Sequence, residues 1–159
     1  METDDFKGFI KYLSSLWGAL GSITVVFPLA DVLFKVIPLP IDPYGKSTAP
    51  IAIPITSMVA LFMLFYTFAQ RQNPRVLSAR QSAACFMLGF VSLALFLLLA
   101  HFEYMLRERL FPFLDSTDDY ILYLVGVVPF YTLFFACVTR AFAILALMEF
   151  RHRRTRTKA

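Results

Sequence analysis

Residues 81–102 read QSAACFMLGFVSLALFLLLAHF, and this stretch decides the fold. It contains no Asp, Glu, Lys or Arg. A helix needs about 20 mostly apolar residues to cross the hydrocarbon core of a bilayer, which is about 30 Å thick. The stretch has this length and lacks the alternation of apolar and polar residues that marks a barrel strand. It therefore predicts a membrane-spanning helix, because a backbone in lipid must satisfy its own hydrogen bonds.

Three further uncharged stretches of similar length lie at residues 12–30, 47–70 and 120–139. The chain of 159 residues is 58% hydrophobic and 16% charged, with a mean hydropathy of +0.66. Soluble domains are about 45–50% apolar and about 25% charged, so the composition argues against a soluble enzyme with an ordinary polar surface. We predict an all-α integral membrane protein whose residues 1–159 form one domain, a four-transmembrane-helix bundle. Its helices are expected at about 12–30, 51–70, 81–110 and 120–150, followed by a basic tail at 151–159.

Lys and Arg are unevenly distributed among the segments that flank these stretches. Most lie in the N-terminal segment, the 71–80 loop and the tail, whereas the 31–50 and 103–119 loops carry fewer cations and several carboxylates. Segments rich in Lys and Arg stay on the cytoplasmic side of a membrane. The sequence therefore predicts that both termini are cytoplasmic and that the chain is a multi-pass protein of the inner (plasma) membrane.

Asp31 and Lys35 stand where the first helix is expected to end. Pro28 removes a backbone donor and predicts a kink about one turn earlier. On a helix that continues, Asp31 and Lys35 share a face and form a charge pair among the outer headgroups. The alternative is a re-entrant turn that lines a cavity, since charged residues inside a membrane tend to be functional.

Residues 141–148 read AFAILALM and are apolar on every side of a helix. Arg140 precedes them and is expected to mark the inner membrane boundary. A helix that is apolar all round must be covered, either by the N-terminal segment, the inner leaflet or another subunit. We expect another copy of the chain to cover it, which makes the protein a homo-oligomer. The predicted interface consists of Arg140, Phe142, Leu145, Met148 and Glu149, with Arg140 and Glu149 pairing between subunits.

Few residues could carry chemistry. His101 lacks further ligands at a spacing typical of metal sites, so we expect no metal. Cys85 and Cys137 are expected at similar depth near the inner face as unbridged thiols, with a regulatory disulfide or palmitoylation as the alternative. The sequence has no nucleophile elbow, P-loop or dinucleotide-binding fingerprint. We therefore expect neither enzyme activity nor a cofactor.

The tail concentrates positive charge next to a membrane helix. Such a segment binds the anionic membrane surface or an acidic cytoplasmic partner. It lacks the interleaved aromatic residues that favour nucleic acid, so no specific nucleic-acid binding is expected. The residues concerned are Arg151, Arg153, Arg154, Arg156 and Lys158.

The run VFPLADVLFKVIP at 26–38, preceded by Leu16-Trp17-Gly18, resembles the opening of small multi-span membrane proteins of bacterial anti-phage defence systems. Those proteins are encoded beside CRISPR or cyclic-nucleotide signalling genes. The resemblance covers residues 16–38, and no cytoplasmic nucleotide-binding domain follows, which departs from the signalling type. It implies an oligomeric membrane effector that perturbs the bilayer when a partner signals.

These observations together predict a non-enzymatic, oligomeric membrane subunit that acts as an effector, pore or membrane anchor for a cytoplasmic protein partner. The alternative is a small channel or transporter with its own substrate. A transporter favours charged residues at mid-depth. In this sequence the ionisable groups other than cysteine and tyrosine stand at the edges of the predicted spans.

Overall fold

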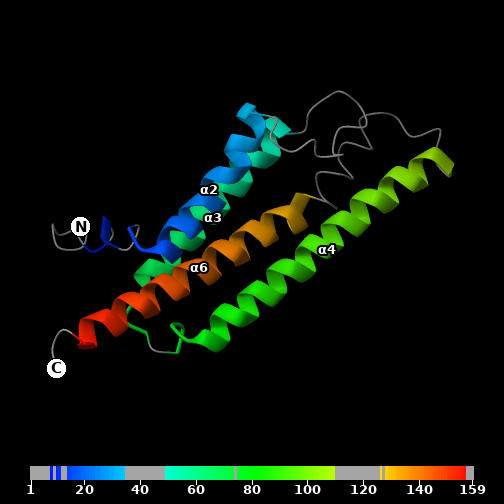
Figure 1. Ribbon diagram of the computed structural model, residues 1–159. Coiled ribbons are helices and arrows are strands. Elements are labelled where there is room, and N and C mark those ends of the chain that lie inside the picture. Colours follow the sequence, from blue (N-terminus) through cyan, green and yellow to red (C-terminus); the bar gives the residue numbers. More distant parts are fainter. Residues whose placement is uncertain are drawn as a thin grey trace.

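The computed structural model describes residues 8, 10–11, 14–34, 49–73, 75–109, 126 and 128–156. These residues form four helices, and the predicted all-α class is confirmed. Helices α2 and α4 run in one direction and α3 and α6 in the other (Figure 1). Their bounds are α2 Leu16–Phe34, α3 Ala49–Ala69, α4 Ala79–Arg109 and α6 Val128–Arg156.

Two serines set helix starts that the apolar pattern alone misplaced. The Ser15 hydroxyl accepts a hydrogen bond from the Gly18 backbone N–H at 3.0 Å, and Ser78 does the same for Gln81 at 3.2 Å. A serine at this position caps a helix by satisfying one of its free N–H groups. Helix α2 therefore begins at Leu16 and α4 at Ala79, rather than at the predicted residues 12 and 81.

Helix α2 also ends later than predicted. It continues through Pro28, which is buried, as far as Phe34, whereas the sequence placed its end near residue 30. Proline removes one backbone hydrogen bond, and here the helix resumes beyond it. At the other end of the chain, the predicted start of the last helix at residues 120–125 lies outside the described residues.

Helix α6 occupies the centre of the molecule. Helix α4 packs on one side of it, and the α2–α3 pair packs on the other (Figure 1). The buried side chains of α6 include four alanines, Ala136, Ala141, Ala143 and Ala146. Small residues let helix backbones approach closely, which suits a helix that must accommodate neighbours on several sides. The other three helices are therefore arranged around α6.

Side-chain hydrogen bonds join each of the three outer helices to α6. Two join hydroxyl pairs, Thr24 with Thr139 at 2.7 Å and Thr56 with Thr132 at 2.9 Å. In the third, the Ser82 hydroxyl of α4 donates to the Ala141 carbonyl oxygen at 3.1 Å. Hydroxyl side chains of this kind bind helices together where the surroundings are apolar. These bonds fix the register of α2, α3 and α4 on the central helix.

Two glycines allow the closest approaches to α6. A Cβ atom added at Gly89 of α4 would lie 3.2 Å from Val138 Cγ2 and 3.4 Å from Cys137 Cβ. A Cβ added at Gly21 of α2 would lie 3.4 Å from Phe142 Cβ. Helix α4 thus lies against α6 at Gly89 with no room for a larger side chain.

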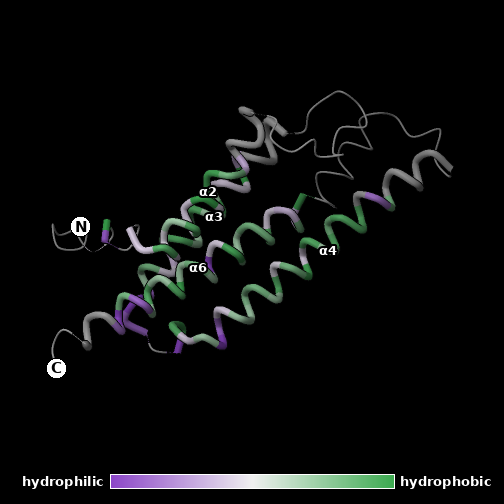
Figure 2. Tube along the Cα trace, viewed as in Figure 1, coloured by the Kyte–Doolittle hydropathy of each residue, from purple (hydrophilic) through white to green (hydrophobic). Residues whose placement is uncertain are grey.

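Hydrophobic residues occupy most of the described length of the helices (Figure 2), and many of the large ones are exposed. Two segments are long and apolar enough to cross a membrane, Ala79–Leu99 in α4 and Val128–His152 in α6. Helices α2 and α3 add shorter apolar stretches, Leu16–Pro28 and Pro54–Ala69. Only 22% of the most apolar part of Ala79–Leu99 is buried, whereas the core helix of a soluble protein is mostly buried. Helix α4 therefore presents its apolar side chains outward.

Candidate functional site

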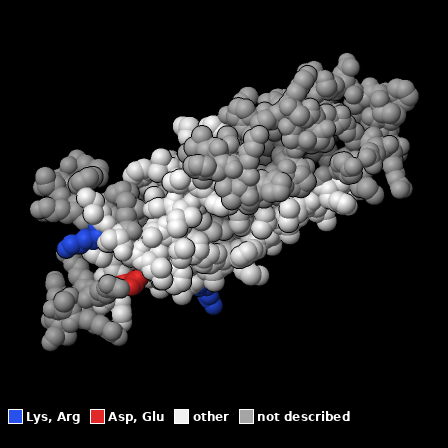
Figure 3. Space-filling model, turned by 45° about the horizontal axis from the view of Figure 1, so that its top comes forward, with Lys and Arg blue, Asp and Glu red and all other residues white. Residues whose placement is uncertain are grey.

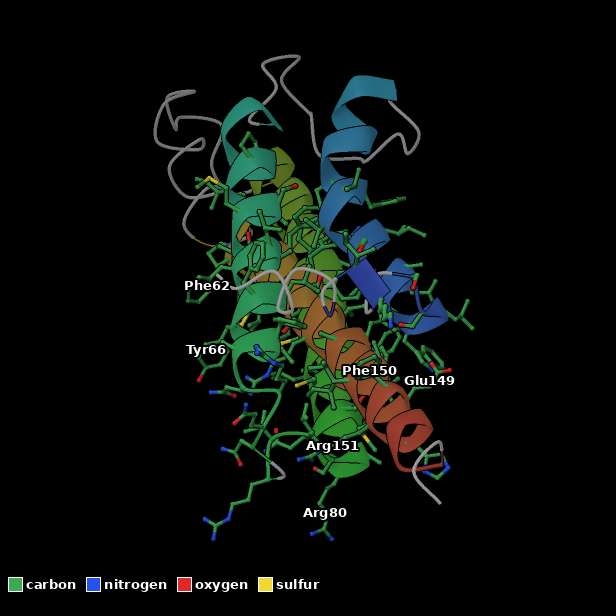
Figure 4. All side chains as sticks on the ribbon, turned by 90° about the vertical axis from the view of Figure 1, so that its left-hand side faces the viewer. Phe62, Tyr66, Arg80, Glu149, Phe150 and Arg151 are labelled. Carbon is green, nitrogen blue, oxygen red and sulfur yellow. The ribbon has the colours of Figure 1, made fainter. Side chains whose placement is uncertain are left out.

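Positive charge gathers at one end of the molecule, which we call the basic end. With the exception of Arg140, every described Lys and Arg side chain lies there, and the middle of the face in Figure 3 is uncharged. Arg80 and Arg151 mark this end in Figure 4. The Arg151 guanidinium lies 3.5 Å from the Gln72 carbonyl oxygen, which ties the end of α6 to the α3–α4 loop. The basic end comprises Lys11, Arg71, Arg75, Arg80 and Arg151.

Arg140 is the one described cation that lies among apolar helices. The Ser82–Ala141 hydrogen bond places it about one turn from the start of α4 at Ala79. Its Cζ atom lies 5.8 Å from the ring centroid of Tyr66, which is within cation–π range. Its Nε atom is buried and has no hydrogen-bond partner among the described residues. Arg140 thus holds a partly desolvated charge next to an aromatic ring.

A second polar atom near this position also lacks a partner. Gln70 follows Tyr66 by one turn, and its backbone N–H donates to the Tyr66 carbonyl oxygen at 3.1 Å, so both side chains lie on one face of α3. Gln70 Oε1 is buried without a hydrogen-bond donor in the described part of the chain. We call Arg140, Tyr66 and Gln70, which stands one turn beyond Tyr66, the Arg140 site.

Exposed apolar side chains lead away from the Arg140 site along α3. Phe62 stacks on Tyr66 with ring centroids 6.1 Å apart, and Met58 lies one turn further on. Their exposed fractions are 41% for Tyr66, 64% for Phe62 and 70% for Met58. Phe62 and Tyr66 project from the side of α3 that faces away from α2 (Figure 4). We call Met58, Phe62 and Tyr66 the α3 column.

The segment predicted to form an oligomer interface is largely covered within one chain. Ile144 is fully buried and Leu147 is 5% exposed. Phe142 packs between Trp17 of α2, with ring centroids 6.0 Å apart, and Phe86 of α4, at 5.1 Å. One chain therefore covers much of this segment, because α6 lies between α4 and the α2–α3 pair, while Phe142, Leu145 and Met148 are half-buried. Self-association stays a prediction.

The remaining residues of the predicted interface are half-buried on α6. Leu145, Met148 and Glu149 follow the buried core of the segment toward the basic end, and Met148 packs against that core. Arg140 is half-buried, and its guanidinium lies beside Tyr66 of its own chain, so its pairing with Glu149 of another subunit stays a prediction.

Cys85 and Cys137 are free thiols, as predicted. Cys137 is buried against α4, because a Cβ at Gly89 would lie 3.4 Å from Cys137 Cβ. Cys85 lies one turn before Gly89 and one turn after Ser82, whose contact is Ala141. Both cysteines therefore lie at similar height on adjacent helices, which confirms the predicted alignment. No group of three or more His, Cys, Asp or Glu able to hold a metal occurs among the described residues.

Several predicted site residues lie where the structure gives no side-chain description. The side chain of Asp31, and Lys35 altogether, fall outside the described residues, so their charge pair is not placed. The same holds for the side chains of Arg153, Arg154 and Arg156 and for Lys158. Of the basic tail, Arg151 is described, and it is exposed.

Sequence reasoning missed Tyr66, Gln70 and Gly89. Tyr66 and Gln70 stand near the end of an apolar stretch, where a tyrosine is an ordinary interfacial residue. A glycine inside an apolar helix can mark a close approach of another backbone, and this signal was present at Gly89. Comparisons with models of known protein families, with curated proteins and with solved structures give no match.

Proposed function

We propose that this chain is a multi-pass protein of the inner membrane, in which all four helices cross the bilayer and the basic end faces the cytoplasm. The exposed apolar surface of α4 carries this proposal, since only 22% of the most apolar part of this helix is buried. Monomeric soluble proteins rarely expose large contiguous apolar patches. The gathering of Lys11, Arg71, Arg75, Arg80 and Arg151 at one end supports the orientation, because Lys and Arg accumulate on the cytoplasmic side.

Within the membrane, we propose that the protein is a non-enzymatic subunit that anchors a cytoplasmic partner at the basic end. The central position of α6 supports an anchor over a pore within one chain, because its buried alanines and Ile144 fill the middle of the described helices. A pore or bilayer-perturbing effector would instead require several copies. The defence setting implied by residues 16–38 would make the partner the component that senses the signal.

Topology reporters test the membrane arrangement. Fusions after Ala159 and within residues 72–79 are expected to report a cytoplasmic location, and a fusion within residues 116–119 is expected to report the outside. The full chain is expected to stay in the membrane fraction after alkaline extraction. Labelling of the 72–79 loop from the outside, or release of the chain by alkali, would contradict the proposal.

Dye release from liposomes separates the anchor from the pore. Vesicles containing the purified full-length chain are expected to retain an entrapped fluorophore as well as protein-free vesicles do. Release that rises with the amount of protein would refute the anchor and favour a pore. The mass of the particle in mild detergent tests self-association independently, because a single-chain mass removes the homo-oligomer while leaving the anchor intact.

A further inference from the structure

The Arg140 site offers hydrogen-bonding groups that the described chain does not use. Arg140 Nε is a buried donor without an acceptor, and Gln70 Oε1 is a buried acceptor without a donor. Glu149, the one described acidic side chain on α6, lies nine residues beyond Arg140, which is about 13.5 Å along a helix. Burying a hydrogen-bond donor without an acceptor is unfavourable, so an anion that supplied an oxygen to Arg140 Nε would be held.

The position of the site identifies the kind of anion. Arg140 lies about one turn from the start of α4 and beside Tyr66, which precedes the end of α3 at Ala69 by one turn. In the arrangement proposed above, this level adjoins the inner leaflet, whose headgroups carry phosphate. Guanidinium groups bind phosphate with strong, charge-assisted hydrogen bonds.

The surroundings of the site also match the rest of a lipid molecule. The α3 column leads from Tyr66 toward the opposite end of α3 and is exposed over Met58 and Phe62. An acyl chain lying on this column would extend from a headgroup held at Arg140. A free inorganic anion would use Arg140 and leave the column without a role.

We propose that the Arg140 site binds the headgroup of an anionic glycerophospholipid from the inner leaflet, with an acyl chain on the α3 column. Arg140 Nε donates to a phosphate oxygen, and Gln70 Oε1 accepts from a hydroxyl of a glycerol headgroup. This proposal rests on the membrane location proposed above and deepens it by naming a ligand.

Native mass spectrometry of the full-length protein in detergent tests the lipid site, with phosphatidylglycerol as the probe. The wild type is expected to retain bound phosphatidylglycerol, and Arg140→Gln is expected to bind it at least about 10-fold more weakly, as for a lost hydrogen bond to a charged group. Arg80→Gln is the matched control, because it removes the same charge from an exposed position at the basic end. It is expected to bind like the wild type.

Further variants and ligands separate the parts of the proposal. Arg140→Lys keeps the charge and is expected to bind more tightly than Arg140→Gln. Gln70→Leu is expected to weaken binding of phosphatidylglycerol but not of phosphatidic acid, which lacks the headgroup hydroxyls. Circular dichroism of each variant verifies that the helices are intact, so that a loss of binding is not a loss of folding.

The outcomes that overturn the lipid site differ from those that overturn the membrane location. Equal binding by the wild type and Arg140→Gln refutes the site, as does equally tight binding of a diacylglycerol with the same chains. Competition by millimolar inorganic phosphate, with no preference for the lipid, assigns Arg140 to a free anion instead and also refutes it. A wild-type chain that is released from membranes by alkali refutes the proposed location, whereas a retained chain without the lipid refutes the lipid site alone.

Discussion

Replacing Gly89 by isoleucine should separate α4 from the central helix. Helix α4 packs chiefly on α6, and Gly89 lies against Val138 and Cys137 of that helix. A Cβ at this position would already lie 3.2 Å from Val138 Cγ2 and 3.6 Å from the Phe134 carbonyl oxygen. Isoleucine branches at Cβ, and Val138 is itself confined to few rotamers in a helix, so neither side chain can turn away.

The magnitude follows from two opposing effects. Forcing extra carbons into a packed interface costs about 1–3 kcal/mol, and the upper part of that range applies at Gly89 because the first added carbon is already in close contact. The gain in helix propensity from glycine to isoleucine is about 0.5 kcal/mol. The free energy of unfolding should therefore fall by about 2 kcal/mol. For a chain of this size, that corresponds to a melting temperature lower by about 4–8 °C.

Thermal unfolding in mild detergent, followed by circular dichroism, measures this change. Ala94→Ile is the control, because Ala94 is on the same helix and is exposed. It should shift the melting temperature by much less than Gly89→Ile. If both variants melted at the temperature of the wild type, α4 would not be seated on α6 at Gly89, and the register of the two helices would be wrong.

Three further changes probe the interior of the bundle. Thr24→Val removes the hydroxyl pair with Thr139 and should lower the free energy of unfolding by about 0.6 kcal/mol, measured by unfolding in detergent; an unchanged value would mean that the pair contributes nothing. Ile144→Glu places a carboxylate at a fully buried position and should abolish the folded particle in size-exclusion chromatography, whereas a folded, dissociated particle would restore an intersubunit role for this segment. A maleimide should label Cys85 faster than Cys137, since Cys137 is the more buried; equal rates in the folded protein would contradict the packing of α4 on Cys137.

The helices themselves could be predicted from the sequence. Long uncharged stretches gave the all-α class, and the absence of charge in residues 81–102 anticipated the apolar surface of α4. The similar height of Cys85 and Cys137 could also be predicted. Each lies a few residues from the same end of two antiparallel helices, so the two positions fall at one level. The first residue of a helix was harder to predict. The caps at Ser15 and Ser78 decide where α2 and α4 begin, and the apolar pattern does not show them.

Which helix lies at the centre was decided only in the tertiary structure. The stretch 141–148 is apolar on every side, and a sequence does not distinguish burial against lipid, another subunit or the same chain. The choice depends on small residues and hydroxyls that match across helices distant in the sequence, such as Gly89 with Val138 and Thr24 with Thr139. For the same reason Arg140 reads as a boundary residue in the sequence, while its neighbours Tyr66 and Gln70 emerge only when α3 packs beside α6. The hydropathy of a residue follows from its own side chain, whereas the neighbour that buries this side chain is decided by how the helices pack.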